Sequence, residues 1–240
     1  MFCMQSAILK ISRWILILFV CVLLSLALEQ SLDRYVPDEY NPFEPLSIND
    51  DITFLTKQKI NNLKSDQDAC LDVLADSDLK FKPLPDQETG ESCGLFNTAL
   101  LEQSAISYGG GITLKCPALV SLAIWEKHAL KPLAEEILQQ EVVRIRHYGT
   151  YACRNVNNRK VGRRSQHAYA NAIDVAGFVL QDGSEISVLR DWGKETPKGQ
   201  FLSAIHQSAC QYFSTVLGPN YNAAHNNHFH FDQGPSRICR

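Results

Sequence analysis

The chain has 240 residues, of which 45% are hydrophobic and 20% are charged. This length is enough for one domain with a buried core and an N-terminal extension. The formal net charge of -3 gives no reason to expect nucleic acid as a partner, and the spread of Gly and Pro through the sequence argues against a low-complexity chain.

Residues 1–28 have the composition of a targeting segment. Lys10 and Arg13 precede a fifteen-residue apolar run that begins at Trp14. Such a run fits the core of a secretory signal, and the positive charges before it would hold the N-terminus in the cytosol. Because a membrane span usually needs about 20 apolar residues, a cleaved signal peptide and an uncleaved membrane anchor both remain open. In either case we expect the body of the protein to leave the cytosol.

Residues 29–54 are acidic, contain proline and lack an apolar period, which predicts a linker. The domain that follows is expected to cover residues 55–240, and a helix is predicted over residues 51–80 from its apolar face. The segment 111–140 begins as a strand and becomes helical after a proline that suits the first turn of a helix. A second proline, Pro132, should break or bend that helix.

The second half of the domain alternates between strands and helices. Residues 141–149 and 150–156 are rich in β-forming side chains, and residues 172–190 predict a hairpin with its turn at 181–184. Residues 199–218 have helical spacing up to Gly218-Pro219, and "HFHFD" at the end alternates like a strand. The predicted fold class is therefore α+β, with a central antiparallel sheet and flanking helices.

Six cysteines lie beyond the apolar run, an even number that predicts three disulfides in an oxidising compartment. A cysteine zinc site is the rival interpretation, but no C-x-x-C spacing supports it. Six cysteines allow 15 pairings, and the sequence does not choose among them. Pairing in chain order predicts the bonds Cys70–Cys93, Cys116–Cys153 and Cys210–Cys239.

Four of the seven histidines fall in two short segments, "SQHAYANAID" and "HNNHFHFD". In the first, Asp174 shares a strand face with two alanines, and His167 lies seven residues earlier, within reach of the same space. In the second, His228 and His230 share one strand face while two phenylalanines take the other. Two imidazoles and one carboxylate form a three-ligand zinc (Zn²⁺) set with a fourth position for water, the pattern of a catalytic rather than a structural site.

These two segments resemble the motifs of a known group of enzymes. "SQHAYANAID" looks like the S-x-H-x-x-G-x-A-x-D motif of the LAS-type zinc peptidases, which include lysostaphin, D-Ala-D-Ala carboxypeptidases and hedgehog domains; Ala170 stands where that pattern has Gly. "HNNHFH" resembles the H-x-x-H-x-H of penicillin-insensitive murein endopeptidases. The body from about Cys70 to Cys239 looks like the extensin-like C-terminal domain family of bacterial envelope proteins, through "TYACR", the hairpin, "CQYFSTVLGPNYN" and "HFHFD".

The resemblance implies a hedgehog or D-Ala-D-Ala peptidase-like fold and a set of site residues. It makes His167, Asp174 and His230 the zinc ligands and His228 the catalytic histidine. His225 becomes a residue beside the metal or the substrate, and Arg154 looks like the strand arginine that helps D-Ala-D-Ala peptidases hold a carboxylate or oxyanion. No E-x-x-H or E-x-W-H supplies the glutamate base of the carboxypeptidase branch, so the histidine-base branch matches better.

Three interpretations follow. The first is a zinc-dependent peptidase in the periplasm or cell envelope that hydrolyses an amide in peptidoglycan stem peptides or cross-links, held at the inner membrane if its N-terminal segment is retained. The second is a zinc-bearing module that binds wall polymer or a protein without cleaving it. The third is a disulfide-rich structural protein without metal. Ser165 is expected to cap or orient the His167 loop rather than to act as a nucleophile.

Overall fold

The computed structural model describes residues 2–240, with side-chain exposure described from Arg13 onward except at Asp33. The chain divides into an N-terminal unit that ends at Pro45 and a globular unit over Leu46–Arg240. The N-terminal unit contains α1 (Phe2–Tyr35), followed by a single 3₁₀ turn, η1 (Asp38–Tyr40). Within α1, Arg13–Leu32 has a mean hydropathy of 2.4 and none of it is buried. This helix is long and apolar enough to cross a membrane, as an anchor or a signal would be.

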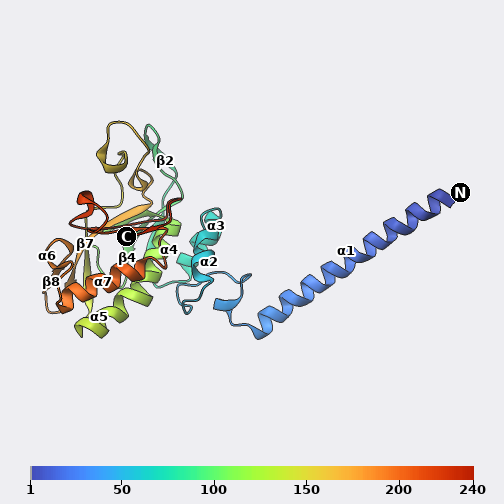
Figure 1. Ribbon diagram of the computed structural model, residues 1–240, viewed down its shortest axis with the longest axis horizontal. Helices are drawn as coiled ribbons and strands as arrows, with labels where there is room; N and C mark the ends of the chain where they lie inside the picture. The colour runs from blue at the N-terminus through green and yellow to red at the C-terminus, as the bar shows by residue number, and fades with distance from the viewer. Residues whose placement is uncertain (1) are drawn as a thin grey trace. The chain divides into compact units, whose positions relative to one another are not determined.

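The globular unit is a mixed α+β structure, as the sequence predicts (Figure 1). Three disulfides hold it together, the number that the sequence predicts. Its helices are α2 (Thr56–Asn62), α3 (Gln67–Ala75), α4 (Cys116–Trp125), the π-helix η2 (Glu126–Leu130), α5 (Lys131–Leu138), α6 (Val188–Asp191) and α7 (Pro197–Ala209). Three short 3₁₀ helices complete the set: η3 (Val156–Asn158), η4 (Gln166–Tyr169) and η5 (Ala223–His225).

The largest sheet has six strands in the order β11-β9-β10-β7-β6, with β8 also paired to β7. Its strands are β6 (Val142–His147), β7 (Ala172–Leu180), β8 (Glu185–Ser187), β9 (Thr215–Leu217), β10 (Phe229–Asp232) and β11 (Ile238–Cys239). All pairs are antiparallel except β11 with β9, which is parallel.

Two smaller sheets come from the first half of the globular unit. One has the order β1-β4-β5 and the other pairs β2 with β3. Their strands are β1 (Lys80–Pro83), β2 (Gln87–Gly90), β3 (Cys93–Leu95), β4 (Thr98–Gln103) and β5 (Ile112–Lys115).

One face of the large sheet is packed with aromatic side chains. Phe229 and Phe231 of β10 are fully buried, and Trp125 at the end of α4 meets Phe231 edge to face with ring centroids 5.4 Å apart. Phe178 of β7 and Phe201 of α7 make a similar contact at 5.3 Å. Because Phe229 and Phe231 occupy one face of β10, the side chains that alternate with them along this strand point to the opposite face.

Several predicted elements differ from the observed ones. The single helix expected over 51–80 is two helices, because Asp66 caps α3 by accepting a hydrogen bond from the Ala69 N–H at 3.0 Å. The helix before Pro132 is not broken. It passes through the π-helix η2, in which a carbonyl accepts a hydrogen bond from the N–H five residues ahead instead of four. The N–H that Pro132 lacks is therefore not needed for an ordinary helical hydrogen bond.

Two further predictions are wrong for tertiary reasons. Residues 150–156 form no strand, since their backbone instead pairs irregularly with residues 163–167. The helix expected over 199–218 ends at Ala209, and Thr215–Leu217 forms β9, which lies between β10 and β11. Pairing on both sides outweighs the helical spacing of this segment.

Two of the three disulfides predicted by chain order are also wrong. The observed bonds are Cys70–Cys116, Cys93–Cys153 and Cys210–Cys239, so only the last prediction is confirmed. Cys70 lies on the buried face of α3, which packs against α4, where Cys116 is the first residue. Cys93 begins β3 and lies against the segment that carries Cys153. Each bond therefore joins elements that pack together in space rather than neighbours in sequence.

Gly177 in β7 is a position where the fold depends on the absence of a side chain. A Cβ there would lie 2.1 Å from the backbone oxygen of Ile186 on β8. We predict that Gly177→Ala lowers the free energy of unfolding by at least about 3 kcal/mol, because backbone must move to relieve the overlap. Gly110→Ala, where nothing lies within 4 Å, is the matched control. Equal urea midpoints for the two variants would contradict this packing.

Candidate metal centre

The site is built on the pairing of β7 with β10. Asp174 and His230 are directly opposite each other in the antiparallel register. Their neighbours on these strands, Ile173 and Val175 on β7 and Phe229 and Phe231 on β10, belong to the hydrophobic core. Alternation therefore turns the carboxylate and the imidazole together to the other face, as the sequence pattern indicates.

His167 reaches the same point from the 3₁₀ helix η4. The Ser165 hydroxyl accepts a hydrogen bond from the His167 N–H at 3.4 Å and caps this helix, the role predicted for it. Ala170 ends the helix with φ 49°, a left-handed conformation that favours glycine.

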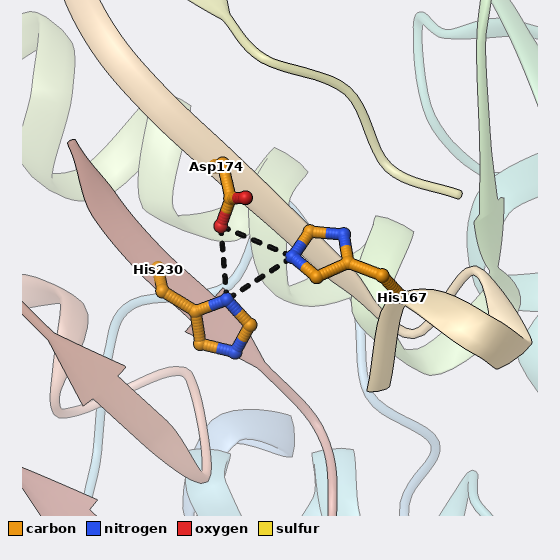
Figure 2. A group of neighbouring side chains, drawn as sticks. All are labelled: His167, Asp174 and His230. Atoms are coloured by element: carbon orange, nitrogen blue, oxygen red, sulfur yellow. Dashed lines mark hydrogen bonds and ion pairs between the residues drawn. The ribbon is translucent and has the colours of Figure 1, made fainter. Parts of the chain in front are cut away.

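The three side chains converge on one small volume (Figure 2). His230 Nδ1 lies 2.9 Å from Asp174 Oδ1, and His167 Nε2 lies 3.1 Å from the same oxygen. The two ring nitrogens are 3.2 Å apart. All three residues are buried. The structure therefore brings together the three residues that the sequence pattern proposes as metal ligands.

Hydrogen bonds on the outer side of each ring decide which nitrogen faces the centre. His167 donates from Nδ1 to the Thr150 carbonyl at 3.2 Å, which leaves Nε2 for the centre. His230 donates from Nε2 to Asp232 Oδ2 at 3.0 Å, which leaves Nδ1. Two imidazole nitrogens and one carboxylate oxygen, with the outer nitrogens held by acceptors, are the donor set and the supporting shell that zinc prefers. The residues present fit such an ion.

The electrostatics of the three groups are strongly coupled. Burial opposes the charge on Asp174, but hydrogen bonds from His167 and His230 outweigh it and hold its pKa well below the usual range. Burial likewise opposes a charge on His230, but the carboxylates of Asp174 and Asp232 raise its pKa to about 9. Without a metal ion, the positive charge that balances these two acids is the His230 imidazolium.

The other predicted site residues surround this centre. His228 Nε2 lies 3.5 Å from Asp174 Oδ1, and Arg154 Nη2 lies 3.9 Å from Asp174 Oδ2. The rings of His225 and His228 are 5.2 Å apart. Burial lowers the pKa of His228. Burial, together with the nearby His230 and His228, lowers the pKa of His225 to about 4. Both rings are therefore neutral at pH 7.

A cavity of about 410 Å³ opens on the exposed side of the site, large enough for a small ligand. Its lining includes Arg154, Asp174, His225, His228 and His230. His128 and His206 lie outside this lining and serve other parts of the fold. His128 bonds the Ile48 carbonyl, and His206 packs against the rings of Trp192 and Phe229.

Asp232 and Thr150 accept hydrogen bonds from the rings of His230 and His167, yet the sequence did not single them out. Asp232 could have been found, because strand alternation puts it on the same face as His228 and His230. The Thr150 carbonyl has no signal in the sequence, since any residue could supply it.

His147 is a further residue that supports the site. It donates from Nε2 to the Tyr108 carbonyl and accepts the Gly149 N–H at Nδ1, both at 3.1 Å. Gly149 turns the chain with φ 113°, and its carbonyl accepts the Asp174 N–H at 3.3 Å. His147 thereby fixes the turn that leads to the Thr150 carbonyl.

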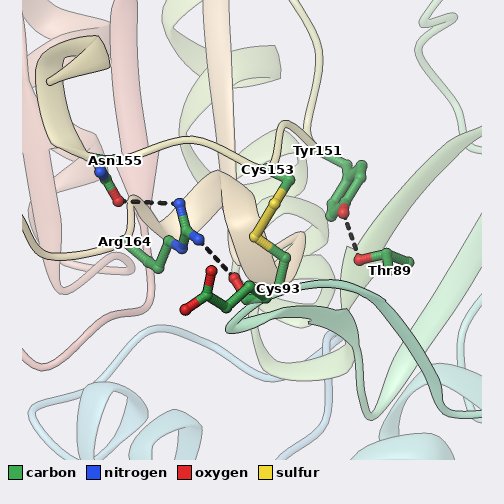
Figure 3. Close-up of a disulfide and its surroundings, with 7 residues drawn as sticks. Thr89, Cys93, Tyr151, Cys153, Asn155 and Arg164 are labelled. Atoms are coloured by element: carbon green, nitrogen blue, oxygen red, sulfur yellow. Dashed lines mark hydrogen bonds between the residues drawn. A yellow bond between two sulfur atoms is a disulfide. The ribbon is translucent and has the colours of Figure 1, made fainter. Parts of the chain in front are cut away.

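A disulfide and a guanidinium tie the site to the β2–β3 hairpin (Figure 3). Cys153, next to Arg154, bonds to Cys93 of β3, and Arg164 donates to the Glu91 carbonyl at 2.6 Å and to Asn155 Oδ1 at 3.1 Å. Tyr151 and Thr89 share a further hydrogen bond between their hydroxyls. The hairpin therefore braces the segment that carries Arg154.

Comparison with known proteins gives one match. The family model for the extensin-like protein C-terminus matches residues 68–240, which include every residue of the site. Among curated proteins and among solved structures, nothing matches.

The raised pKa of His230 predicts how stability depends on pH when metal is removed by a chelator. Protonation of His230 stabilises the folded state. Its contribution to the free energy of unfolding is therefore complete below pH 6.5 and is lost as pH rises through about 9. We expect the free energy of unfolding to fall by roughly 3 kcal/mol across this range. His230→Gln should flatten the profile, whereas His128→Gln should retain the fall. A flat profile for the unaltered protein would refute the assignment of charge.

The two bonds of His147 can be separated by substitution. Asn places an acceptor near the Nδ1 position and preserves the Gly149 contact, whereas Gln reaches toward the Tyr108 carbonyl without it. We predict that His147→Gln weakens zinc binding about tenfold and that His147→Asn stays near the original affinity, because supporting residues typically affect affinity by that order. Competition with a chromophoric chelator measures this. His128→Asn, which removes a similar carbonyl contact elsewhere, is the control, and equal affinities for both His147 variants would exclude the role.

Proposed function

Because the chain belongs to the extensin-like C-terminal family over residues 68–240 and gathers two histidines and an aspartate in one buried cluster, we propose that it is a zinc-dependent peptidase of the bacterial cell envelope. Its substrate is an amide bond of peptidoglycan stem peptides or cross-links. The observation that carries the proposal is the convergence of His167, Asp174 and His230 on one point beside an open cavity.

His167, Asp174 and His230 would hold the zinc ion through Nε2, Oδ1 and Nδ1. When bound at such a site, zinc polarises a carbonyl and makes water a competent nucleophile at neutral pH. Thr150 and Asp232 would keep the two rings in the orientation that ligation needs. The open side of the centre faces the cavity, so a peptide can approach without any change in the buried shell.

His228 is suited to move the proton. Its Nδ1 donates to Asn227 Oδ1 at 2.8 Å, so its Nε2 carries the free lone pair and points toward Asp174. Burial lowers its pKa, so the ring is neutral and can accept a proton from the attacking water and pass it to the leaving amine. Arg154, with its guanidinium in the cavity wall, would stabilise the negative charge that develops on the carbonyl oxygen, with His225 beside it.

The placement of the protein follows from its N-terminal helix and its disulfides. The apolar helix has the character of a signal or an anchor, and three disulfides indicate an exported protein. We propose the periplasm as its compartment, with peptidoglycan as its partner and the inner membrane as its support if the helix is retained. A hedgehog or D-Ala-D-Ala peptidase-like fold belongs to the same proposal.

A second function has one observation in its favour. No glutamate lines the cavity among the described residues, so the usual base of the carboxypeptidase branch has no counterpart there. If His228 does not transfer a proton, the same centre would serve a zinc-bearing module that binds wall material without cleaving it.

Incubation of the zinc-loaded, full-length protein with purified sacculi distinguishes the two functions. We expect one zinc per chain and release of soluble muropeptides. His228→Gln should retain zinc but lower the rate of release by about 10²–10⁴, the usual contribution of a general base, whereas His128→Gln should match the unaltered protein. Zinc binding with no muropeptide release by any form would favour the binding module, and absence of zinc would exclude both.

A further inference from the structure

Residues 155–164 follow Arg154 and form a loop whose charged side chains are all positive. We call this segment the basic loop. Its sequence NVNNRKVGRR contains four cations, and no Asp or Glu occurs between Arg154 and Asp174. The whole chain has a net charge of -3. The positive charge is therefore concentrated beside the candidate metal centre and does not reflect overall composition.

The basic loop has a defined conformation. Its ends pair as a short ladder, in which the Ser165 N–H donates to the Arg154 carbonyl and the Val156 N–H donates to the Arg163 carbonyl, both at 3.0 Å. Asn155 crosses the loop and donates to the Arg159 carbonyl at 2.9 Å. With the contacts of Arg164 shown in Figure 3, these bonds hold the backbone of the loop in one conformation.

The arginines that line the cavity differ in what they already bind. Arg164 is occupied by Asn155 and the Glu91 carbonyl, and Arg154 lies beside Asp174. Arg163 also lines the cavity, and among the described residues its guanidinium has no hydrogen-bond or ion-pair partner. Arg163 is thus a cation at the cavity wall whose donors are free.

The acids of the cavity cannot neutralise this charge. Among the described residues, its lining contains two carboxylates, those of Asp174 and Asp232, and both bond to His230. The side chains of Asn157 and Asn158 on the loop, and of Asn227 opposite, add neutral hydrogen-bonding groups to the same wall. A ligand that fills the cavity therefore meets uncompensated positive charge and amides, which favour an anionic polar group.

We propose that Arg163 binds a carboxylate of the substrate, apart from the amide that is cut and from the group that Arg154 contacts. The inference rests on the proposed function, because it treats the cavity as the substrate site. A guanidinium presents paired donors that match a carboxylate in a bidentate geometry, and arginine clusters are a recurring means of recognising acidic motifs. The substrate is accordingly an acidic peptide, and removal of its carboxylate charge should weaken binding.

The test compares sacculi with their carboxylates intact and sacculi in which they are converted to neutral amides by carbodiimide coupling. Zinc-loaded, full-length protein in mild detergent is mixed with each at low ionic strength, and the bound fraction and the soluble muropeptides are measured in the same tubes. Arg163→Gln is compared with Arg159→Gln, an exposed arginine of the same loop that does not line the cavity. Thermal melting verifies that both variants fold.

We expect Arg163→Gln to bind intact sacculi about tenfold more weakly than the unaltered protein, the order expected for one charge-assisted pair. It should bind amidated sacculi as the unaltered protein does, and Arg159→Gln should lose little on either. Equal binding of the two variants, or no effect of amidation on the unaltered protein, overturns the inference. The release of muropeptides reports on the peptidase function separately, so failure of one is distinguishable from failure of the other.

Discussion

The register between β7 and β10 is the constraint on which the site depends. Since side chains alternate along a strand, a shift of one residue would turn Asp174 into the core and bring Ile173 or Val175 to the cavity side. The core prevents this shift, because Phe229 and Phe231 are fully buried, and Phe231 packs against Trp125 of α4 and Phe213 in the segment before β9. Hydrophobic packing on one face thus fixes the polar chemistry on the other.

The polar face requires support that the strands alone do not supply. His167 comes from a separate 3₁₀ helix, whose start is capped by Ser165 and whose ring is held by the Thr150 carbonyl. That carbonyl belongs to a segment fixed by His147 at one end and by the Cys93–Cys153 bond at the other. The disulfide therefore contributes to the arrangement of the site as well as to stability.

The sequence predicts well those elements and side-chain orientations that a local residue pattern determines. Strand alternation indicated the shared face of His228 and His230, and the β7–β8 hairpin and the helix after Cys116 follow from residue type and proline position. The sequence does not predict the strand pairings and disulfides that depend on contacts between distant segments. Thr215–Leu217 has helical spacing but forms a strand between two partners, and Cys70 bonds to Cys116 because α3 packs on α4. The carbonyl of Thr150 carries no sequence signal at all.

The central claim is that His167, Asp174 and His230 ligate one zinc ion with a solvent-facing position left open. X-ray absorption at the zinc edge on the purified full-length protein tests it most directly. We predict about four nitrogen or oxygen ligands near 2.0–2.1 Å, with the outer-shell scattering of two imidazole rings. Sulfur ligands near 2.3 Å, or a spectrum without imidazole scattering that is unchanged by Asp174→Ala, would contradict it.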